Sequence, residues 1–254
     1  MWLWDEHGFW WRGWRWAWCP SAGHAATVVS GDRDANGPLV VDPSGDPLDL
    51  RLDLSGSADD YLSVPEGDEL AMRMAYTDMR GSHPGYINHA YGRAVHDANG
   101  QIVLQYWLFY FNQETILSAG AHQGDWEMVS VRLGGNNQPE GALYAQHGSD
   151  GHSCQWSNVG HDHSSDTPDV FVAETSHASY FTAGRQGLRD VADGDGDWLI
   201  PPVTEIKSAN PAWVAWPGHW GGTDSGSRSP PGPGSQPQWG AHDEWAGTVE
   251  DVCD

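Results

Sequence analysis

Hydrophobic and polar residues alternate along much of the chain between residues 86 and 181. The segment QIVLQYWLFYFNQ, residues 101–113, is β-prone and carries aromatic side chains at both odd and even positions. Residues 126–133, WEMVSVRL, alternate with a period of two, and residues 141–148, GALYAQHG, form another short apolar segment. Such alternation is typical of strands that bury one face, and aromatics on both faces predict a central strand.

Turn-forming residues separate these segments at short intervals. Asn99-Gly100 predicts a hairpin just before residue 101, and GGNN at residues 134–137 ends the next alternating run. Residues 168–181 predict a further strand that runs into a turn, and no long amphipathic helix pattern is present. The pattern therefore predicts an all-β fold: an antiparallel β-sandwich, jelly-roll-like, with long loops rich in Gly, Pro and Asp.

The first 33 residues differ from the rest, which we expect to form a single domain over residues 34–254. Seven of the 16 tryptophans lie within the first 18 residues, where Arg12 and Arg15 interrupt the aromatic run. This arrangement is unlike a secretory signal peptide. It is compatible with an anchor at a membrane interface or with a start codon assigned upstream of the native one.

Composition and charge exclude several classes of protein. The chain has 254 residues, 39% of them hydrophobic, with 35 acidic against 12 basic side chains and a net charge of −23. No apolar run is long enough for a transmembrane helix, and the negative charge disfavours nucleic acid as a partner. A single lysine, Lys207, in so acidic a chain favours a salt-adapted, halophilic host, with codon bias as the alternative.

Three cysteines, Cys19, Cys154 and Cys253, occur without any CxxC spacing. An odd number in this pattern argues against a disulfide framework and against a thiolate zinc site. One disulfide can form, but the spacing does not select the pair.

The densest cluster of reactive side chains lies around Asp125-Trp126-Glu127. Residues i and i+2 of a strand share a face, so Asp125 and Glu127 are expected to project together. Two carboxylates on an apolar face need a cation, a shared proton or Arg partners. His122 and Glu114 precede them closely, and this ligand set suits Mg²⁺, Ca²⁺ or Mn²⁺. The alternative is a turn Asp, a core Trp and a surface Glu.

AHQGDWEMVSVRL, with LQYWLFYFNQ before it and LYAQHG and VFVAETSHASYF after it, resembles the vacuolar protein sorting-associated protein 62 family. The later segment PGHWGG…SPPGPGSQPQW also resembles the end of that family's domain. The resemblance covers roughly residues 86–240. It implies a domain of poorly defined activity, and the family name suggests a trafficking or interaction module.

A more distant similarity is to the necrosis- and ethylene-inducing peptide-like proteins, which are secreted β-sandwich cytolysins with the motif GHRHDWE. That family holds a divalent cation with an acidic residue, a His, an Asp and a Glu. The resemblance implies these roles for Glu114, His122, Asp125 and Glu127, and it implies secretion. Gly124 stands where the family has a second His, a departure that argues against carrying over the cytolysin activity.

Three further residues are candidate ligand contacts. His147, at a strand end, either completes the same cleft or caps the strand. His177 lies in a Ser-His-Ala turn, where ties within the turn are favoured over catalysis by Ser176 or Ser179, because no GxSxG elbow is present. Trp126, between the two carboxylates, is a ligand contact or a core residue.

Three other clusters favour non-ligand roles. A solvated polar loop best explains the three histidines His152, His161 and His163. Three acidic residues fail the EF-hand spacing and are read as a solvated turn: Asp193, Asp195 and Asp197. Core or lid packing is expected of the four tryptophans Trp213, Trp216, Trp220 and Trp239.

Three functions are compatible with these features. The favoured hypothesis is a protein that binds a glycan or lipid headgroup through a divalent cation. The second is a hydrolase at the same site, with Glu127 or His147 as general base. The third is an interaction or trafficking module with a structural cation. The sequence assigns no catalytic residue and no oligomeric state.

Overall fold

The structure is a computed structural model of the chain. It describes residues 39–41, 47–48, 58, 61–63, 90–113, 122–146, 150–162, 166–173, 176–186, 190–192, 201, 203–207, 212–220, 229–240 and 253. The predictions for residues 1–33, Glu114, His147, His163 and the acidic segment 193–197 lie outside these ranges.

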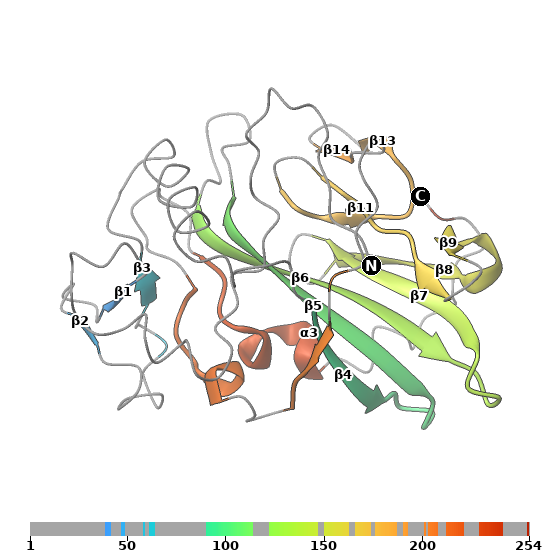
Figure 1. Ribbon diagram of the computed structural model, residues 1–254, viewed down its shortest axis with the longest axis horizontal. Coiled ribbons are helices and arrows are strands. Elements are labelled where there is room, and N and C mark those ends of the chain that lie inside the picture. Colours follow the sequence, from blue (N-terminus) through green and yellow to red (C-terminus); the bar gives the residue numbers. More distant parts are fainter. Residues whose placement is uncertain are drawn as a thin grey trace.

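A six-stranded sheet forms the centre of the molecule, in the order β15-β4-β5-β6-β7-β8 (Figure 1). Its strands are β4 (Ala90–His96), β5 (Ile102–Gln113), β6 (His122–Leu133), β7 (Pro139–Gln146), β8 (Asp150–Gln155) and β15 (Val203–Glu205). Strands β4 to β8 are consecutive antiparallel neighbours, as the turn signals predict. The expectation of a purely antiparallel sheet is wrong at β15, which runs parallel to β4 because this short segment returns from much later in the chain.

Short hairpins surround this sheet. Antiparallel pairs join β9 (His161–Asp162) to β10 (Thr167–Pro168), β11 (Phe171–Val172) to β12 (Ser179–Tyr180), and β13 (Gly184–Gln186) to β14 (Asp190–Ala192). A separate three-stranded sheet contains β1 (Leu39–Val41), β2 (Pro47–Leu48) and β3 (Tyr61–Ser63). The fold is mostly β, as expected, with one six-stranded mixed sheet and several small hairpins, and the jelly-roll sandwich stays a prediction.

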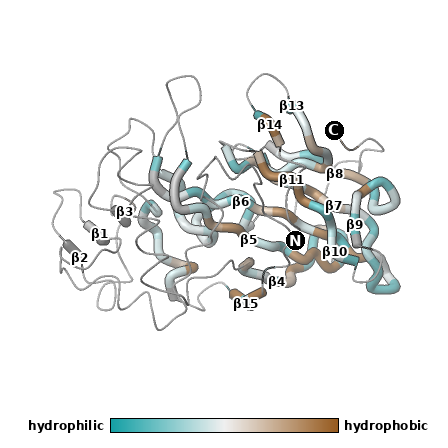
Figure 2. The backbone as a smooth tube through the Cα atoms, turned by 45° about the horizontal axis from the view of Figure 1, so that its top comes forward, coloured by the Kyte–Doolittle hydropathy of each residue, from teal (hydrophilic) through white to brown (hydrophobic). Residues whose placement is uncertain are grey.

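Both faces of the central sheet are buried. We call the side that carries Asp125, Glu127 and Val129 of β6 the acidic face, and the side that carries Trp126 and Met128 the aromatic face. The two sides pack in separate hydrophobic clusters. Strands β5, β6 and β7 are brown or white along most of their length in Figure 2, and the teal colour gathers at the turns.

The C-terminal part of the chain covers the aromatic face. It contains the 3-10 helices η2 (Ala212–Ala215) and η3 (Pro233–Ser235) and the single helical turn α3 (Pro237–Gly240). The aromatic segment PAWVAW, residues 211–216, predicts a strand, but residues 212–215 form a 3-10 turn instead. The core packing expected of the tail tryptophans is confirmed for three buried ones: Trp213, Trp216 and Trp220.

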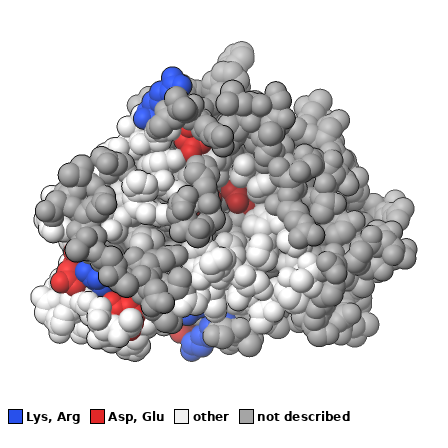
Figure 3. Space-filling view, turned by 180° about the vertical axis from the view of Figure 1, so that it is seen from behind, with Lys and Arg blue, Asp and Glu red and all other residues white. Residues whose placement is uncertain are grey.

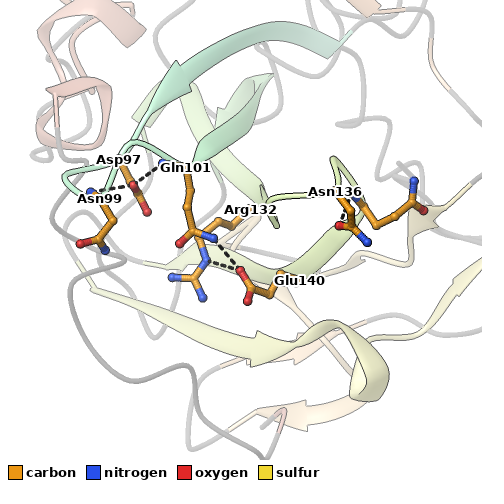
Figure 4. A network of polar contacts seen from close by, with 7 residues as sticks. Asp97, Asn99, Gln101, Arg132, Asn136 and Glu140 are labelled. Atoms are coloured by element: carbon orange, nitrogen blue, oxygen red, sulfur yellow. Dashed lines mark hydrogen bonds and ion pairs between the residues drawn. The ribbon is translucent and has the colours of Figure 1, made fainter.

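The hairpin between β4 and β5 lies where Asn99-Gly100 predicts it, with Gly100 at φ 81°. Its loop is longer than two residues, because the Asp97 N–H donates to the Gln101 carbonyl at 2.9 Å. Oδ1 of Asp97 also accepts from the Asn99 and Gln101 amides (Figure 4). Beside it, Glu140 on the neighbouring hairpin accepts from the Gln101 side chain at 2.8 Å.

The expected polar loop at residues 150–155 is wrong, because this segment adds the edge strand β8 to β7. The strand presents His152 to solvent and buries Cys154. Cys154 forms a disulfide with Cys253, 99 residues later in the chain. The cysteine spacing left the disulfide pair open, and the structure shows that the bond joins the edge strand β8 to Cys253.

Candidate functional site

Asp125 and Glu127 lie together on the acidic face, as the alternation predicts. Across the sheet, Asp125 is opposite Tyr110 and Glu127 is opposite Leu108, both on β5. Directly opposite residues of an antiparallel pair point to the same side, so all four side chains share that face. Both carboxylates are buried, with 6% and 8% of their surface exposed.

His177 reaches this pair from the turn that joins β11 to β12. Its ring nitrogen Nδ1 donates to Oδ2 of Asp125 at 2.9 Å, and its ring stacks on Tyr110 with centroids 4.2 Å apart. The residue has a φ of 59°, a left-handed conformation that is costly for a side chain other than glycine. The hydrogen bond and the ring stack offset part of that cost.

Asp190 on β14 adds a third carboxylate near Glu127. Its Oδ2 accepts from the Tyr180 hydroxyl at 2.6 Å and its Oδ1 from the Ser176 hydroxyl at 2.9 Å. Ser176 also accepts from the Ala178 amide, so it ties the turn that carries His177. This is the structural role expected for the turn, since the Ser176 hydroxyl donates to Asp190 and accepts from the Ala178 amide.

The buried acidic groups perturb one another. Burial raises the pKa of Glu127 well above its ordinary value of 4.5, and the negative charges of Asp125 and Asp190 raise it further. Burial and the bond to Asp190 also raise the pKa of Tyr180. A carboxyl group in this position binds a proton or a cation more readily than an exposed one.

His122, at the start of β6, is buried and bonded to its own strand. Its Nδ1 lies 2.7 Å from the Gly124 carbonyl oxygen. A carbonyl only accepts, so Nδ1 carries the proton and the neutral ring has its lone pair on Nε2. That tautomer is the one a metal-binding imidazole uses when a backbone carbonyl orients it.

Within the described ranges, no group of three His, Cys, Asp or Glu side chains is arranged to hold a metal ion. The expected four-ligand site is therefore described only in part. Asp125 and Glu127 share a face, His122 lies on the same strand, and Glu114 is outside the described residues. His147, the other expected neighbour, is outside them as well.

Trp126 lies on the aromatic face, on the other side of the sheet from the two carboxylates. Its ring packs on Phe109 at 4.9 Å, on Trp220 at 5.3 Å and on Trp213 at 5.7 Å between centroids. Alternation along β6 sends it there, so it does not contact a ligand bound between Asp125 and Glu127.

Gly124, which replaces the second motif His of the cytolysins, is required by the local packing. Its φ is 63°, and a Cβ at this position would overlap the carbonyl oxygen of Trp220. The tail therefore packs directly against the backbone of β6. A histidine at position 124 has no room here.

Sequence reasoning missed Tyr110 and Asp190. Tyr110 was read as one aromatic residue of a central strand, and nothing local marks it as the partner of a histidine 67 positions later. Asp190 belongs to a segment rich in Asp, where no signal separates a buried carboxylate from solvated ones. Tertiary contact alone selects these residues.

Comparison with known proteins does not place the chain in a family. No family model matches the chain, and no curated protein matches it. The resemblance to the vacuolar protein sorting-associated protein 62 family thus stays a prediction. None of the helices that the structure describes is long and apolar enough to cross a membrane.

Solved structures of a necrosis- and ethylene-inducing peptide-like protein do match in part. The chain is similar to NLPPya in complex with mannosamine, with 17% identity and a TM-score of 0.33 over 47% of this chain and 51% of that chain. It is similar to NLPPya in complex with glucosamine, with 14% identity and a TM-score of 0.33 over 50% of this chain and 56% of that one. The chain thus spans about half the length of these structures.

Proposed function

We propose that this chain binds a divalent cation at the Asp125–Glu127 end of β6 and uses it to hold a polar ligand, a glycan or a lipid headgroup. The observation that carries the proposal is the burial of three neighbouring carboxylates, Asp125, Glu127 and Asp190, of which Asp125 accepts from the His177 imidazole. Like charges in a buried site repel, and a cation offsets that repulsion.

The donor types suit a hard cation. Carboxylate oxygens of Asp125 and Glu127, with Nε2 of His122, are ligands that Mg²⁺, Ca²⁺ and Mn²⁺ accept, and Glu114 is the expected fourth ligand. The ion would supply a positive charge toward which hydroxyl or phosphate oxygens of a ligand can turn. His177, held by Asp125, would orient a polar group of the same ligand.

The test is thermal unfolding of metal-stripped protein titrated with each of the three ions. An ion at 100 times its dissociation constant stabilises by about 2.7 kcal/mol, or roughly 5–10 °C for a chain of this size. We expect the wild type to shift and Glu127→Gln not to shift. Glu140→Gln is the matched control, because Glu140 is an exposed glutamate that pairs with Arg132 at 3.5 Å (Figure 4).

If no ion raises the melting temperature of the wild type, the proposed cation is absent and the site binds a proton instead. If an ion does, the ion-loaded protein is tested on phospholipid vesicles and on monosaccharides. Glucosamine and mannosamine belong in that panel, since they are the sugars bound in the two NLPPya complexes.

A hydrolase is the second candidate, favoured by the Asp125–His177 pair. A buried carboxylate that accepts from Nδ1 fixes the tautomer of an imidazole and is a common support for a general base. Two single variants, Glu127→Gln and His177→Gln, separate the two functions. A binding protein loses affinity in the Glu127 variant, whereas a hydrolase with a His177 base keeps its affinity in the His177 variant and loses turnover.

A further inference from the structure

A row of polar side chains crosses the aromatic face, on the opposite side of the sheet from Glu127. Arg93 on β4 is opposite Gln105 on β5, and Gln105 is opposite Ser130 on β6. Hydrophobic residues flank this row, with Trp107 two positions after Gln105 on the same face. Polar residues at three adjacent positions of a buried face are unusual, because each must be satisfied by a hydrogen bond.

These side chains are buried and only partly bonded. Gln105, Ser130 and Gln238 of α3 are 3%, 1% and 3% exposed. One bond joins them, from Nε2 of Gln105 to the Gln238 carbonyl at 3.1 Å. In this row and its immediate flank, five buried atoms have no hydrogen-bond partner among the described residues: Arg93 Nη1, Gln105 Oε1, Trp107 Nε1, Ser130 Oγ and Gln238 Oε1.

Arg93 adds to the desolvation cost of this row of polar side chains. Its guanidinium lies over the Trp239 ring at 3.7 Å and forms no ion pair with a described carboxylate. Burial lowers its pKa to about 10. Leaving polar groups desolvated and unbonded costs roughly 1–3 kcal/mol each, so a ligand that bonded several of them would be held firmly.

The hydrogen-bonding inventory of the row selects the class of ligand. Arg93 and Trp107 offer donors, Gln105 and Gln238 offer carbonyl acceptors, and the Ser130 hydroxyl does both. The orientation of Gln105 is fixed, because its Nε2 already donates to a carbonyl. An anion would satisfy only the donors and a metal ion only the acceptors. A hydroxyl group both donates and accepts.

We propose that this row is a binding site for a neutral hydroxylated small molecule, a polyol or a monosaccharide. The rings of Trp107 and Trp239, with centroids 5.9 Å apart, supply the apolar wall against which the carbon face of such a ligand packs. Arg93 and Trp239 are the half-buried members of the group. They form its solvent side, and a ligand enters by displacing their stacked pair.

The site is separate from the proposed cation site, so its test is run in EDTA. Glycerol, glucose and mannose are titrated while tryptophan fluorescence and saturation-transfer NMR are recorded. We expect saturable binding, weakened about five- to tenfold in Gln105→Met and in Ser130→Ala, which each remove one polar partner. Gln101→Met, at a partly exposed glutamine of the β4–β5 loop, leaves the affinity unchanged.

Two results overturn the proposal. If no probe binds saturably to the wild type, the row is filled by ordered water alone. If a probe binds and neither the Gln105 nor the Ser130 variant weakens it, the ligand lies elsewhere. Ser130→Ala removes one oxygen atom and keeps the side chain small, so it tests the site even if Gln105→Met lowers the stability of the fold.

Discussion

Two features of the structure disfavour any side chain at Gly124: its positive φ and the carbonyl oxygen of Trp220, which a Cβ atom would overlap. We expect Gly124→Ala to lower the free energy of unfolding by roughly 3 kcal/mol or more, the combined cost of a strained backbone and of overpacking. Urea unfolding measures it. Gly135→Ala is the control, since a Cβ there meets nothing within 4 Å, and an equal loss in both variants would contradict this account.

Glu127 makes the stability of the metal-free protein depend on pH. Its folded-state pKa lies above 4.5, so the folded protein retains a proton that the unfolded chain releases. The contribution of this bound proton to the free energy of unfolding is fully present below pH 4.5 and is lost as the pH rises through the folded-state pKa. We expect Glu127→Gln to gain stability relative to the wild type across that rise, as followed by urea unfolding in EDTA.

Glu140→Gln serves as the control for that comparison, because Glu140 is half exposed. The excess of the Glu127→Gln effect over the Glu140→Gln effect is the part that burial of Glu127 accounts for. Parallel profiles for Glu127→Gln and the wild type would mean that Glu127 is not desolvated in the folded state.

The β11–β12 hairpin and β14 hold the His177 turn through Asp190. Tyr180→Phe removes the 2.6 Å hydrogen bond from the Tyr180 hydroxyl to the Asp190 carboxylate. We expect a loss of about 1.5–3 kcal/mol in the free energy of unfolding. Tyr106→Phe, on β5, loses no hydrogen bond to a residue of the described ranges and should cost less than about 0.5 kcal/mol. Chemical unfolding of both variants decides this, and equal losses would remove Asp190 from the support of the turn.

At the scale of secondary-structure elements, the strands show what a local sequence pattern can predict. Alternation located β5, β6 and β7 to within a few residues and placed Asp125 and Glu127 on one face. The 3-10 turn at residues 212–215 and the edge strand β8 were misread, because AWVA is compatible with either conformation and DGHSCQ has the composition of a loop. Packing against the sheet decides both.

At the scale of the whole molecule, the Cys154–Cys253 disulfide closes a loop across 99 residues. In the chain-entropy model, a loop of this length contributes up to about 4.7 kcal/mol. We expect Cys253→Ser or a reducing agent to lower the melting temperature by several degrees, and reduction to have no further effect on the variant. A thiol assay should find one free thiol per unfolded, unreduced chain, and three would contradict the pairing.

The described part of the surface carries few charged side chains, because most of the acidic residues of the chain lie outside the described ranges. On the face shown in Figure 3, the described acidic and basic side chains lie in a few small groups, and in some of these red and blue atoms are side by side. Salt adaptation therefore stays a prediction from composition.

The sequence by itself determined the strand periods, the hairpin positions and the shared face of Asp125 and Glu127, because these depend on neighbours a few residues apart. Only the tertiary structure decided that His177, Tyr110 and Asp190 join those carboxylates, and that Arg93, Gln105 and Ser130 line up under α3. Such groupings depend on which strands pair and which segments cover each face. That choice is made by burial over the whole chain, and no local pattern encodes it.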